Sequence, residues 1–189
     1  MTEADFIACI RQNPINAAIL DGVPDLGLPD AWLVSGSLFQ TVWNHLTGRA
    51  PDHGVKDYDI FYFDPDTSYE AEDAQIRRVG LVLADLDAEI ELRNQARVHL
   101  WYEDHFGIDY PPLRSSCEGI DRFLAVACKV GVSLDGKERL YAPDGLDDLT
   151  RMRVRPNPSG NFSAEHYTSK SARWHVMWPE VHVVPAENE

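Results

Sequence analysis

Four aspartates lie within residues 56–68, and the first two have the spacing of a metal site. The segment KDYDIFYFD is rich in aromatic and β-branched residues, which favours a β-strand. Side chains alternate along a strand, so Asp57 and Asp59 project to the same face. Two carboxylates held this close repel each other unless a cation neutralises them, and hard oxygen ligands suit Mg²⁺. The pair therefore predicts a divalent-cation site on one face of the strand.

The same stretch supports a competing interpretation. Its second pair, Asp64 and Asp66, follows a hydrophobic run and precedes Thr67, an arrangement that resembles the first motif of the haloacid-dehalogenase-like phosphohydrolases. This resemblance implies that Asp64 is a nucleophile that forms an aspartyl-phosphate, and that Asp66 is the general acid/base. The motif covers one segment only, and the next predicted strand, EIELRN, does not end in the Ser or Thr that such a fold requires. The sequence therefore favours the first pair.

The segments before the first pair supply a site for a phosphate. AWLVSG, residues 31–36, is a short apolar run that ends in glycine and predicts a buried strand. SLFQTVWNHLTG then predicts a helix with Ser37 as its N-cap and Gly48 at its end. Gly36 lets the backbone approach a ligand closely, and a helix N-terminus offers unpaired N–H groups to a phosphate. Gly36 and Ser37 are therefore candidate phosphate contacts.

A third acid is predicted in the next strand, DAEIELRNQARVHLWY. In this pattern Glu89, Glu91 and Arg93 share one face. If this strand lies beside the one that carries the aspartate pair, a glutamate meets the pair. Three carboxylates from two adjacent strands, facing a helix N-terminus, form a two-metal phosphoryl-transfer site. Glu89 and Glu91 have the same facing, so both remain candidates, and Arg93 is a candidate either for a phosphate contact or for an ion pair.

Predicted strands and helices alternate along the chain, which indicates an α/β (α+β) fold with a mixed sheet and helices packed on it. We expect one domain over residues 1–189, with its core at about 30–105 and a C-terminal helical and hairpin part at about 110–180. The further predicted elements are helices within 3–12, 68–86, 113–128, 144–154 (capped by Asp144) and 162–178, and a hairpin within 129–143.

The basic residues of the chain concentrate near its C-terminus. Lys170 on the last predicted helix is the candidate for binding a nucleotide. The other members of this group are Arg151, Arg153, Arg155 and Arg173. Trp101 and Tyr102, at the end of a predicted strand, are candidates for the wall of a base pocket.

Composition limits the possible partners. The formal net charge is −14, whereas a protein that binds duplex DNA needs a basic footprint, so duplex DNA is not the expected partner. No apolar run is long enough to span a bilayer, and the N-terminal segment is acidic, unlike a signal peptide. The three cysteines are an odd number with no close-set pair, which favours free thiols. We therefore expect a cytoplasmic protein with no membrane partner.

The turn SGS after an apolar strand, the segment DYDI and the later acid together resemble the nucleotidyltransferase superfamily that includes DNA polymerase β. More narrowly, TVWNHLTGR, DYDIFYFD, ELRNQARVHLWY, YAPDGLDDL and VRPNP resemble a bacterial family of small nucleotidyltransferase-like proteins over about residues 30–180. The gap between Ser37 and Asp57 is longer than is usual in the superfamily, and the loop TGRAPDHGV accommodates the excess.

This resemblance implies a role for each motif residue. Gly36 and Ser37 would contact the nucleotide phosphates. Asp57, Asp59 and Glu91 would hold two Mg²⁺ ions, with Mn²⁺ as the alternative ion, and Glu91 would help to activate the attacking hydroxyl. The implied donor is an NTP such as ATP, while the acceptor stays open among a small molecule, a protein and RNA. A non-catalytic nucleotide-binding module of the same fold is the alternative from another class, and the intact trio of acids disfavours it.

Overall fold

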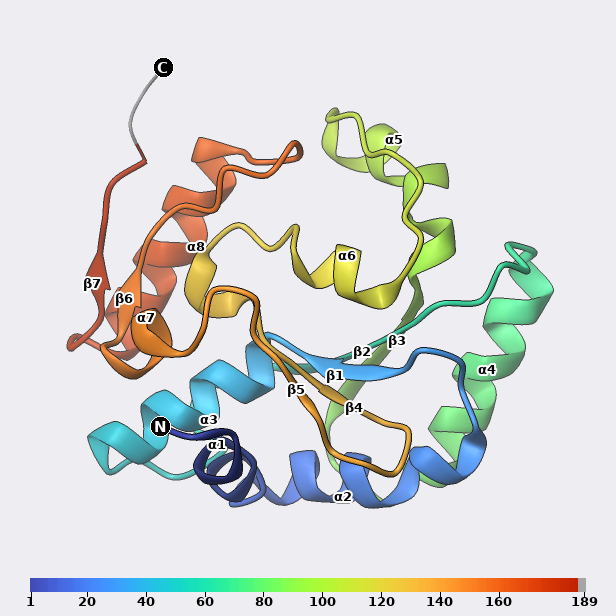
Figure 1. The fold of residues 1–189 in the computed structure, drawn as a ribbon, viewed down its shortest axis with the longest axis horizontal. Coiled ribbons are helices and arrows are strands. Elements are labelled where there is room, and N and C mark those ends of the chain that lie inside the picture. The colour runs from blue at the N-terminus through green and yellow to red at the C-terminus, as the bar shows by residue number, and fades with distance from the viewer. Residues whose placement is uncertain (187–189) are drawn as a thin grey trace.

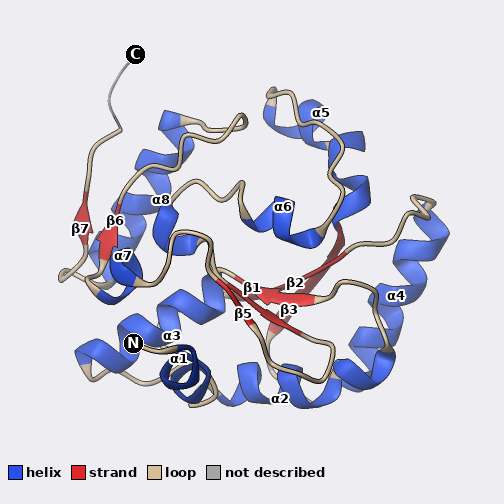
Figure 2. Ribbon diagram, viewed as in Figure 1, coloured by secondary structure: helices blue, strands red, loops and turns tan. Residues whose placement is uncertain are grey.

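A five-stranded mixed sheet lies at the centre of the computed structural model, which describes residues 1–186 (Figures 1 and 2). The strand order is β3-β2-β1-β4-β5. β1 is antiparallel to β2 and to β4, β4 is antiparallel to β5, and β2 and β3 are parallel. The strands are β1 (Trp32–Val34), β2 (Asp57–Tyr62), β3 (Glu89–Asn94), β4 (Gly131–Ser133) and β5 (Leu140–Tyr141).

Helices flank this sheet on two sides, with α1 to α4 on one side and α5, α6 and α8 on the other (Figure 1). The helices are α1 (Glu3–Ile10), α2 (Pro14–Gly22), α3 (Gly36–Thr47), α4 (Tyr69–Val82), α5 (Tyr102–Phe106), α6 (Ser116–Ile120), α7 (Asp147–Thr150) and α8 (Ala164–Met177). Short 3₁₀ turns are η1 (Pro24–Leu26), η2 (Gln95–Leu100) and η3 (Val126–Cys128), and β6 (Arg153–Val154) pairs in parallel with β7 (His182–Val183). These elements confirm the predicted fold class.

Two further predictions concern the whole chain. The prediction of one domain over residues 1–189 stays a prediction, and residues 187–189 lie outside the described residues. Within residues 1–186, no helix is both long enough and apolar enough to cross a membrane.

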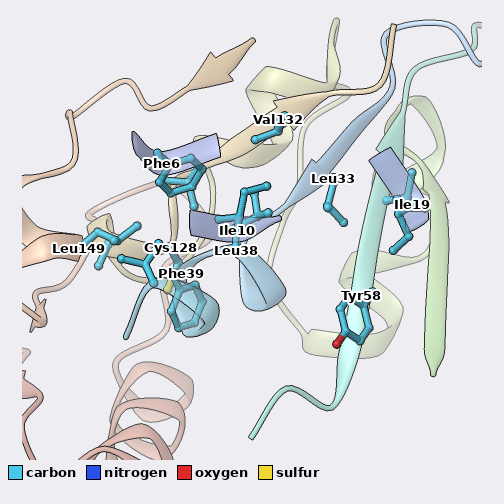
Figure 3. Packing of buried hydrophobic residues seen from close by; sticks show 14 of the residues in the cluster. Phe6, Ile10, Ile19, Leu33, Leu38, Phe39, Tyr58, Cys128, Val132 and Leu149 are labelled. Atoms are coloured by element: carbon cyan, nitrogen blue, oxygen red, sulfur yellow. The ribbon is translucent and has the colours of Figure 1, made fainter. Parts of the chain in front are cut away.

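The alternation of side chains along β2 separates the core from the face that carries the acids. Tyr58, Ile60 and Tyr62 are buried in the main hydrophobic core. The hydroxyl of Tyr58 lies 3.1 Å from the side-chain Nδ2 of Asn13, which precedes α2. Figure 3 shows Tyr58 in this cluster with Leu33 of β1 and other buried side chains. The opposite face of β2 is therefore free of this packing and carries the aspartate pair.

The predicted strand over residues 87–102 is wrong in its second half, because β3 ends at Asn94. The side-chain oxygen of Asn94 accepts hydrogen bonds from the backbone N–H groups of Ala96, at 3.1 Å, and Asp64, at 3.0 Å. Its side-chain nitrogen donates to the carbonyl of Asp64 at 2.9 Å. These bonds turn the chain into η2 and join the end of β3 to the end of β2.

The predicted helix over residues 113–128 is also wrong in part. Only α6 and the turn η3 form, and between them the side-chain nitrogen of Asn157 donates to the carbonyls of Asp121, at 2.7 Å, and Phe123, at 2.8 Å. A continuing helix would need these carbonyls for its own hydrogen bonds. By contrast, the hairpin within 129–143 is confirmed, with Gly136 in its turn at φ +81°.

Two predicted helix caps are wrong. Ser35, not Ser37, is the N-cap of α3, since α3 begins at Gly36. Asp144 does not cap α7, whose N-cap is Leu146, because its carboxylate pairs with Lys129 at 2.7 Å. Ser68 caps α4, and its hydroxyl accepts from the N–H of Ala71 at 3.3 Å.

Gly54, in the long loop between α3 and β2, gives a first test of the packing. Its φ is +72°, and a Cβ there would lie 2.9 Å from Cη2 of Trp178. We expect Gly54→Ala to lower the free energy of unfolding by about 2–4 kcal/mol through backbone strain and steric overlap. Denaturant unfolding measures this change. The control is Gly27→Ala, at φ +63° with no atom within 4 Å, which should lose only the strain contribution. Equal losses at both positions would contradict the packing described for Gly54.

Candidate active site

β2 and β3 bring the predicted acids together. The two strands are parallel, with Asp57 opposite Glu89 and Asp59 opposite Glu91. Asp57 and Asp59 are half-buried on the face that points away from the main core. The predicted adjacency of the two strands is therefore confirmed, and four carboxylates lie on one surface of the sheet.

The pKa of Asp59 shows how crowded this surface is. Burial raises the pKa of this carboxyl to about 7, and the nearby carboxylates of Asp57 and Glu91 contribute in the same direction. Lys170 and Arg93 act in the opposite direction. A carboxylate whose pKa is raised so far by burial, with a further contribution from its neighbours, would be stabilised by a bound cation. The two glutamates also differ in their effect on this pKa. The carboxylate of Glu91, which lies opposite Asp59 in the strand register, contributes to the rise in the pKa of Asp59.

The start of α3 lies against Asp57. β1 ends at Val34, and Ser35 turns the chain at φ +53°, held by a 2.9 Å bond from its N–H to the carbonyl of Val130. A Cβ on Gly36 would lie 3.8 Å from Oδ1 of Asp57, so the helix N-terminus and the aspartate are neighbours. The first N–H groups of a helix have no partner within the helix. They are placed to meet an anion beside the aspartate pair.

Ser37 lies in the first turn of α3, but its side chain does not reach the surface. The residue is fully buried, and its hydroxyl has no hydrogen-bond partner among the described residues. The whole residue, backbone included, is inaccessible to solvent, so of the two predicted phosphate contacts only Gly36 reaches the surface. Ser35, with its positive φ, sets the direction of the helix, and no local pattern of residues indicates that role.

Arg93 pairs with one of the acids. Its guanidinium lies 3.2 Å from Oε2 of Glu91, and both side chains are partly exposed. This is the ion pair that the sequence left open as one of two roles for Arg93. Because the pair is partly exposed, it contributes little to stability and can exchange partners at low cost.

The donor set suits a hard cation in its chemistry. Asp57 and Asp59 supply carboxylate oxygens from one face of one strand, and the raised pKa of Asp59 marks unneutralised negative charge. Among residues 1–186, however, no group of three or more His, Cys, Asp or Glu side chains is arranged to hold a metal ion. Glu91 is directed to Arg93, so its carboxylate would have to leave that partner to become a third ligand. The two aspartates therefore fit a divalent cation, and Glu91 completes the set only after a side-chain rotation.

The second aspartate pair has a structural role. Oδ1 of Asp64 accepts from the N–H of Asp66, and Oδ1 of Asp66 accepts from the N–H of Ser68, both at 2.9 Å. These bonds form the turn between β2 and α4. In addition, β2 is antiparallel to β1, whereas the phosphohydrolase fold needs a parallel sheet around its aspartate. The phosphohydrolase alternative is therefore not favoured.

Lys170 is the basic residue of the C-terminal helix that reaches the acids. It is exposed on α8, and its charge acts on Asp59. Within the described residues it forms no ion pair within 4.0 Å. Two arginines of the same predicted group, Arg153 and Arg155, behave differently because both pair with Asp148. Of these three cations, Lys170 is the one available to a ligand.

A cavity of about 380 Å³ has Phe61, two residues after Asp59 on β2, in its wall. Trp101 and Tyr102, the candidates from the sequence for the wall of a base pocket, also line it. Its wall brings together residues from β2, η2, α5, α6 and α8, which are far apart in the chain. They include Phe61, Trp101, Tyr102, Phe106, Tyr110 and Lys170.

The mixed sheet, with a strand that turns at Ser35 into a helix against an aspartate pair, has the architecture of the nucleotidyltransferase class. A family model described as Nucleotidyltransferase matches residues 21–183, and the chain belongs to this family. The chain is also similar to a solved structure whose description states that it reveals a CCA-adding enzyme head domain. The two are 27% identical with a TM-score of 0.76, over 97% of this chain and 96% of that chain. None of the curated proteins compared matches the chain.

Proposed function

We propose that this nucleotidyltransferase is metal-dependent and transfers a nucleoside monophosphate from an NTP such as ATP to a hydroxyl acceptor. The observation that carries the proposal is the placement of Asp57 and Asp59 beside Glu91 on one side and the N-terminus of α3 on the other. The likeness to a CCA-adding enzyme head domain supports a nucleotide as the transferred group. Bound Mg²⁺, or Mn²⁺ in its place, would neutralise the phosphate charge and lower the pKa of the acceptor hydroxyl.

The residues of the chain have separate roles in this reaction. The N–H group of Gly36 at the start of α3 would bind the terminal phosphates, with Ser37 buried next to it, and Asp57 and Asp59 would hold the metal. Glu91 accepts the proton of the acceptor hydroxyl after it leaves Arg93. The hydroxyl oxygen forms a bond to the α-phosphorus, the bond from that phosphorus to the bridging oxygen breaks, and pyrophosphate leaves with the electron pair. Lys170 and the freed Arg93 offset the charge of the phosphates.

The acceptor and the compartment belong to the same proposal. A small molecule, a protein and RNA all carry suitable hydroxyls. The net charge of −14 argues against a long nucleic acid as the acceptor. The free Cys9, Cys117 and Cys128 support a reducing compartment, and we assign the protein to the cytoplasm.

NTP binding and pyrophosphate release, each with and without Mg²⁺, test the proposal. We expect the double variant Asp57→Ala/Asp59→Ala to lose Mg²⁺-dependent binding by at least about 100-fold, because its metal ligands are gone. Asp64→Ala is the matched control from the same segment and should keep the binding. Loss in the Asp64 variant alone would overturn the assignment and restore the phosphohydrolase. NTP binding with no pyrophosphate release for any acceptor class would instead indicate the non-catalytic module.

A further inference from the structure

Aromatic rings form a large part of the cavity wall. Trp101 and Tyr102 lie with ring centroids 5.9 Å apart, and Tyr102 lies 4.3 Å from Tyr110. Phe61 forms another part of the wall and stacks on Phe123 at 5.7 Å with an interplanar angle of 18°. Aromatic faces of this kind attract other planar rings through offset or edge-to-face stacking.

The cavity and the proposed metal site both involve strand β2. Phe61 follows Asp59 by two residues on the same face of β2, which places their Cα atoms about 7 Å apart along the strand. Lys170 lines the same cavity from α8. Gly36 adjoins Asp57, at the other end of the acid pair. A helix N-terminus, two carboxylates and an aromatic cavity thus follow one another along β2.

The rim of the cavity exposes large apolar rings. Trp101 is 38% and Phe106 39% exposed, although both are of a size that normally packs in a core. They belong to η2–α5, whose small hydrophobic cluster (Val98, Tyr110 and Leu113) is separate from the main core. Packing of the main core therefore does not account for these two rings, whereas a flat ligand at the rim would cover them.

We propose that this cavity holds the planar base of the NTP, stacked on its aromatic wall, while Lys170 contacts the phosphates at the junction with the acids. The assignment rests on the proposed function, since it concerns the donor nucleotide of the same reaction. It follows the order of groups along β2, because a nucleotide has its base at one end, its phosphates at the other and the reacting phosphorus between them.

The polar side chains of the cavity indicate how the base is recognised. The amide nitrogen of Gln95 donates to the carbonyl of Arg93 at 3.5 Å, and that of Asn161 donates to the hydroxyl of Tyr102 at 3.1 Å. Both amide nitrogens are thus engaged within the protein rather than left free for the edge of a base. Stacking is available to every base. We therefore expect the dissociation constants of ATP, GTP, CTP and UTP to agree within about tenfold.

The test compares two ligands, ATP and inorganic triphosphate, because only ATP carries a base. Each ligand is titrated calorimetrically into the protein in the presence of Mg²⁺. Trp101→Ala and Phe106→Ala should weaken ATP binding about tenfold or more and leave triphosphate binding unchanged. Lys170→Ala should weaken both. Tyr69→Ala is the matched control, since Tyr69 is an aromatic residue that is 67% exposed and lies outside the cavity wall. Thermal unfolding of each variant verifies that the fold is kept.

The possible failures are distinguishable. If ATP and triphosphate both bind with Mg²⁺ and ATP affinity is indifferent to Trp101 and Phe106, the assignment of the cavity is overturned while the proposed function stands. A planar acceptor in the cavity would give this result, together with a raised KM for the acceptor in the same variants. If the unaltered protein binds neither ligand, the proposed function fails and the assignment of the cavity fails with it.

Discussion

Asp59→Asn is expected to reduce nucleotidyl transfer about a thousandfold or more and, in the metal-free protein, to raise the thermal stability above pH 7. The loss of activity follows because the amide carries no charge with which to hold a divalent cation, and charge stabilisation of this kind supplies much of the rate in phosphoryl transfer. The gain in stability follows from the environment of the carboxylate, which is half-buried beside Asp57 and Glu91. One substitution should therefore move activity and stability in opposite directions.

The direction of the pH dependence follows from the pKa of Asp59. This pKa is about 7 in the folded protein, against about 3.9 for an aspartate in an unfolded chain. Between these values the folded state binds more protons than the unfolded state, so the contribution of Asp59 to stability falls as the pH rises from about 4 to about 7. Above pH 7 the folded protein carries the full cost of this charge. Asparagine removes the cost, by about 2 kcal/mol after allowance for partial exposure, or about 5 °C in Tm.

Thermal unfolding in a chelator at pH 4.5, 6 and 8 measures this effect. The difference in Tm between Asp59→Asn and the unaltered protein should grow with pH and level off above pH 7. Asp85→Asn serves as the control, because Asp85 is an exposed aspartate in the turn after α4, and it should show no such trend. Saturating Mg²⁺ should stabilise the unaltered protein and not the Asp59 variant. A variant that is less stable than the unaltered protein at pH 8 without metal would contradict the crowding of the acids.

The two strands at the centre of the site were predictable because the pattern that indicates each of them lies within one short segment of the sequence. In DYDIFYF the acids and the buried residues alternate, and EIELRN repeats the pattern, so the shared face of each strand follows from its period of two. The parallel pairing of β2 and β3 then places Asp57, Asp59 and Glu91 on one surface. The roles of these residues in binding and catalysis stay predictions.

The errors occurred where a side chain has a partner far away in the sequence. Asn94 ends β3 because it bonds to the backbone of Asp64, and Asp144 fails to cap α7 because Lys129 engages it. The neighbouring residues in the sequence favour the predicted role in both cases, but tertiary contacts override these local preferences. The aromatic cavity was out of reach for the same reason, since its wall assembles from segments between Phe61 and Lys170. Its two exposed aromatic residues, Trp101 and Phe106, are the local sign of it.

The long loop between α3 and β2 departs from the usual spacing of the superfamily, and a buried interface accommodates it. The side-chain nitrogen of Asn44 on α3 donates to the loop carbonyls of Pro51, at 3.1 Å, and His53, at 2.9 Å. Its side-chain oxygen accepts from the indole N–H of Trp178 at 2.8 Å. Trp178 directly follows α8, the helix that carries Lys170. The interface therefore joins the loop to both helices that border the site.

Trp178→Ala is expected to cost about 3–5 kcal/mol of unfolding free energy, or about 10 °C or more in Tm. The side chain is fully buried, packs edge-on against Trp43 at 5.5 Å, and supplies the only indole hydrogen bond to Asn44 in the described residues. Its removal leaves a cavity and an unpaired amide oxygen. Trp178→Phe keeps most of the packing but not the hydrogen bond, so it should cost about 1–3 kcal/mol.

Denaturant unfolding of both variants separates packing from hydrogen bonding at this interface. Val176→Ala is the control on the same helix, because Val176 is 80% exposed and its truncation should change stability by no more than about 0.5 kcal/mol. Since α8 positions Lys170, Trp178→Ala should also weaken Mg²⁺-dependent NTP binding under conditions where the variant is still folded. A cost for Trp178→Ala as small as that of Val176→Ala would contradict the interface. If NTP binding is unchanged while stability falls as expected, α8 keeps Lys170 in position without the side chain of Trp178.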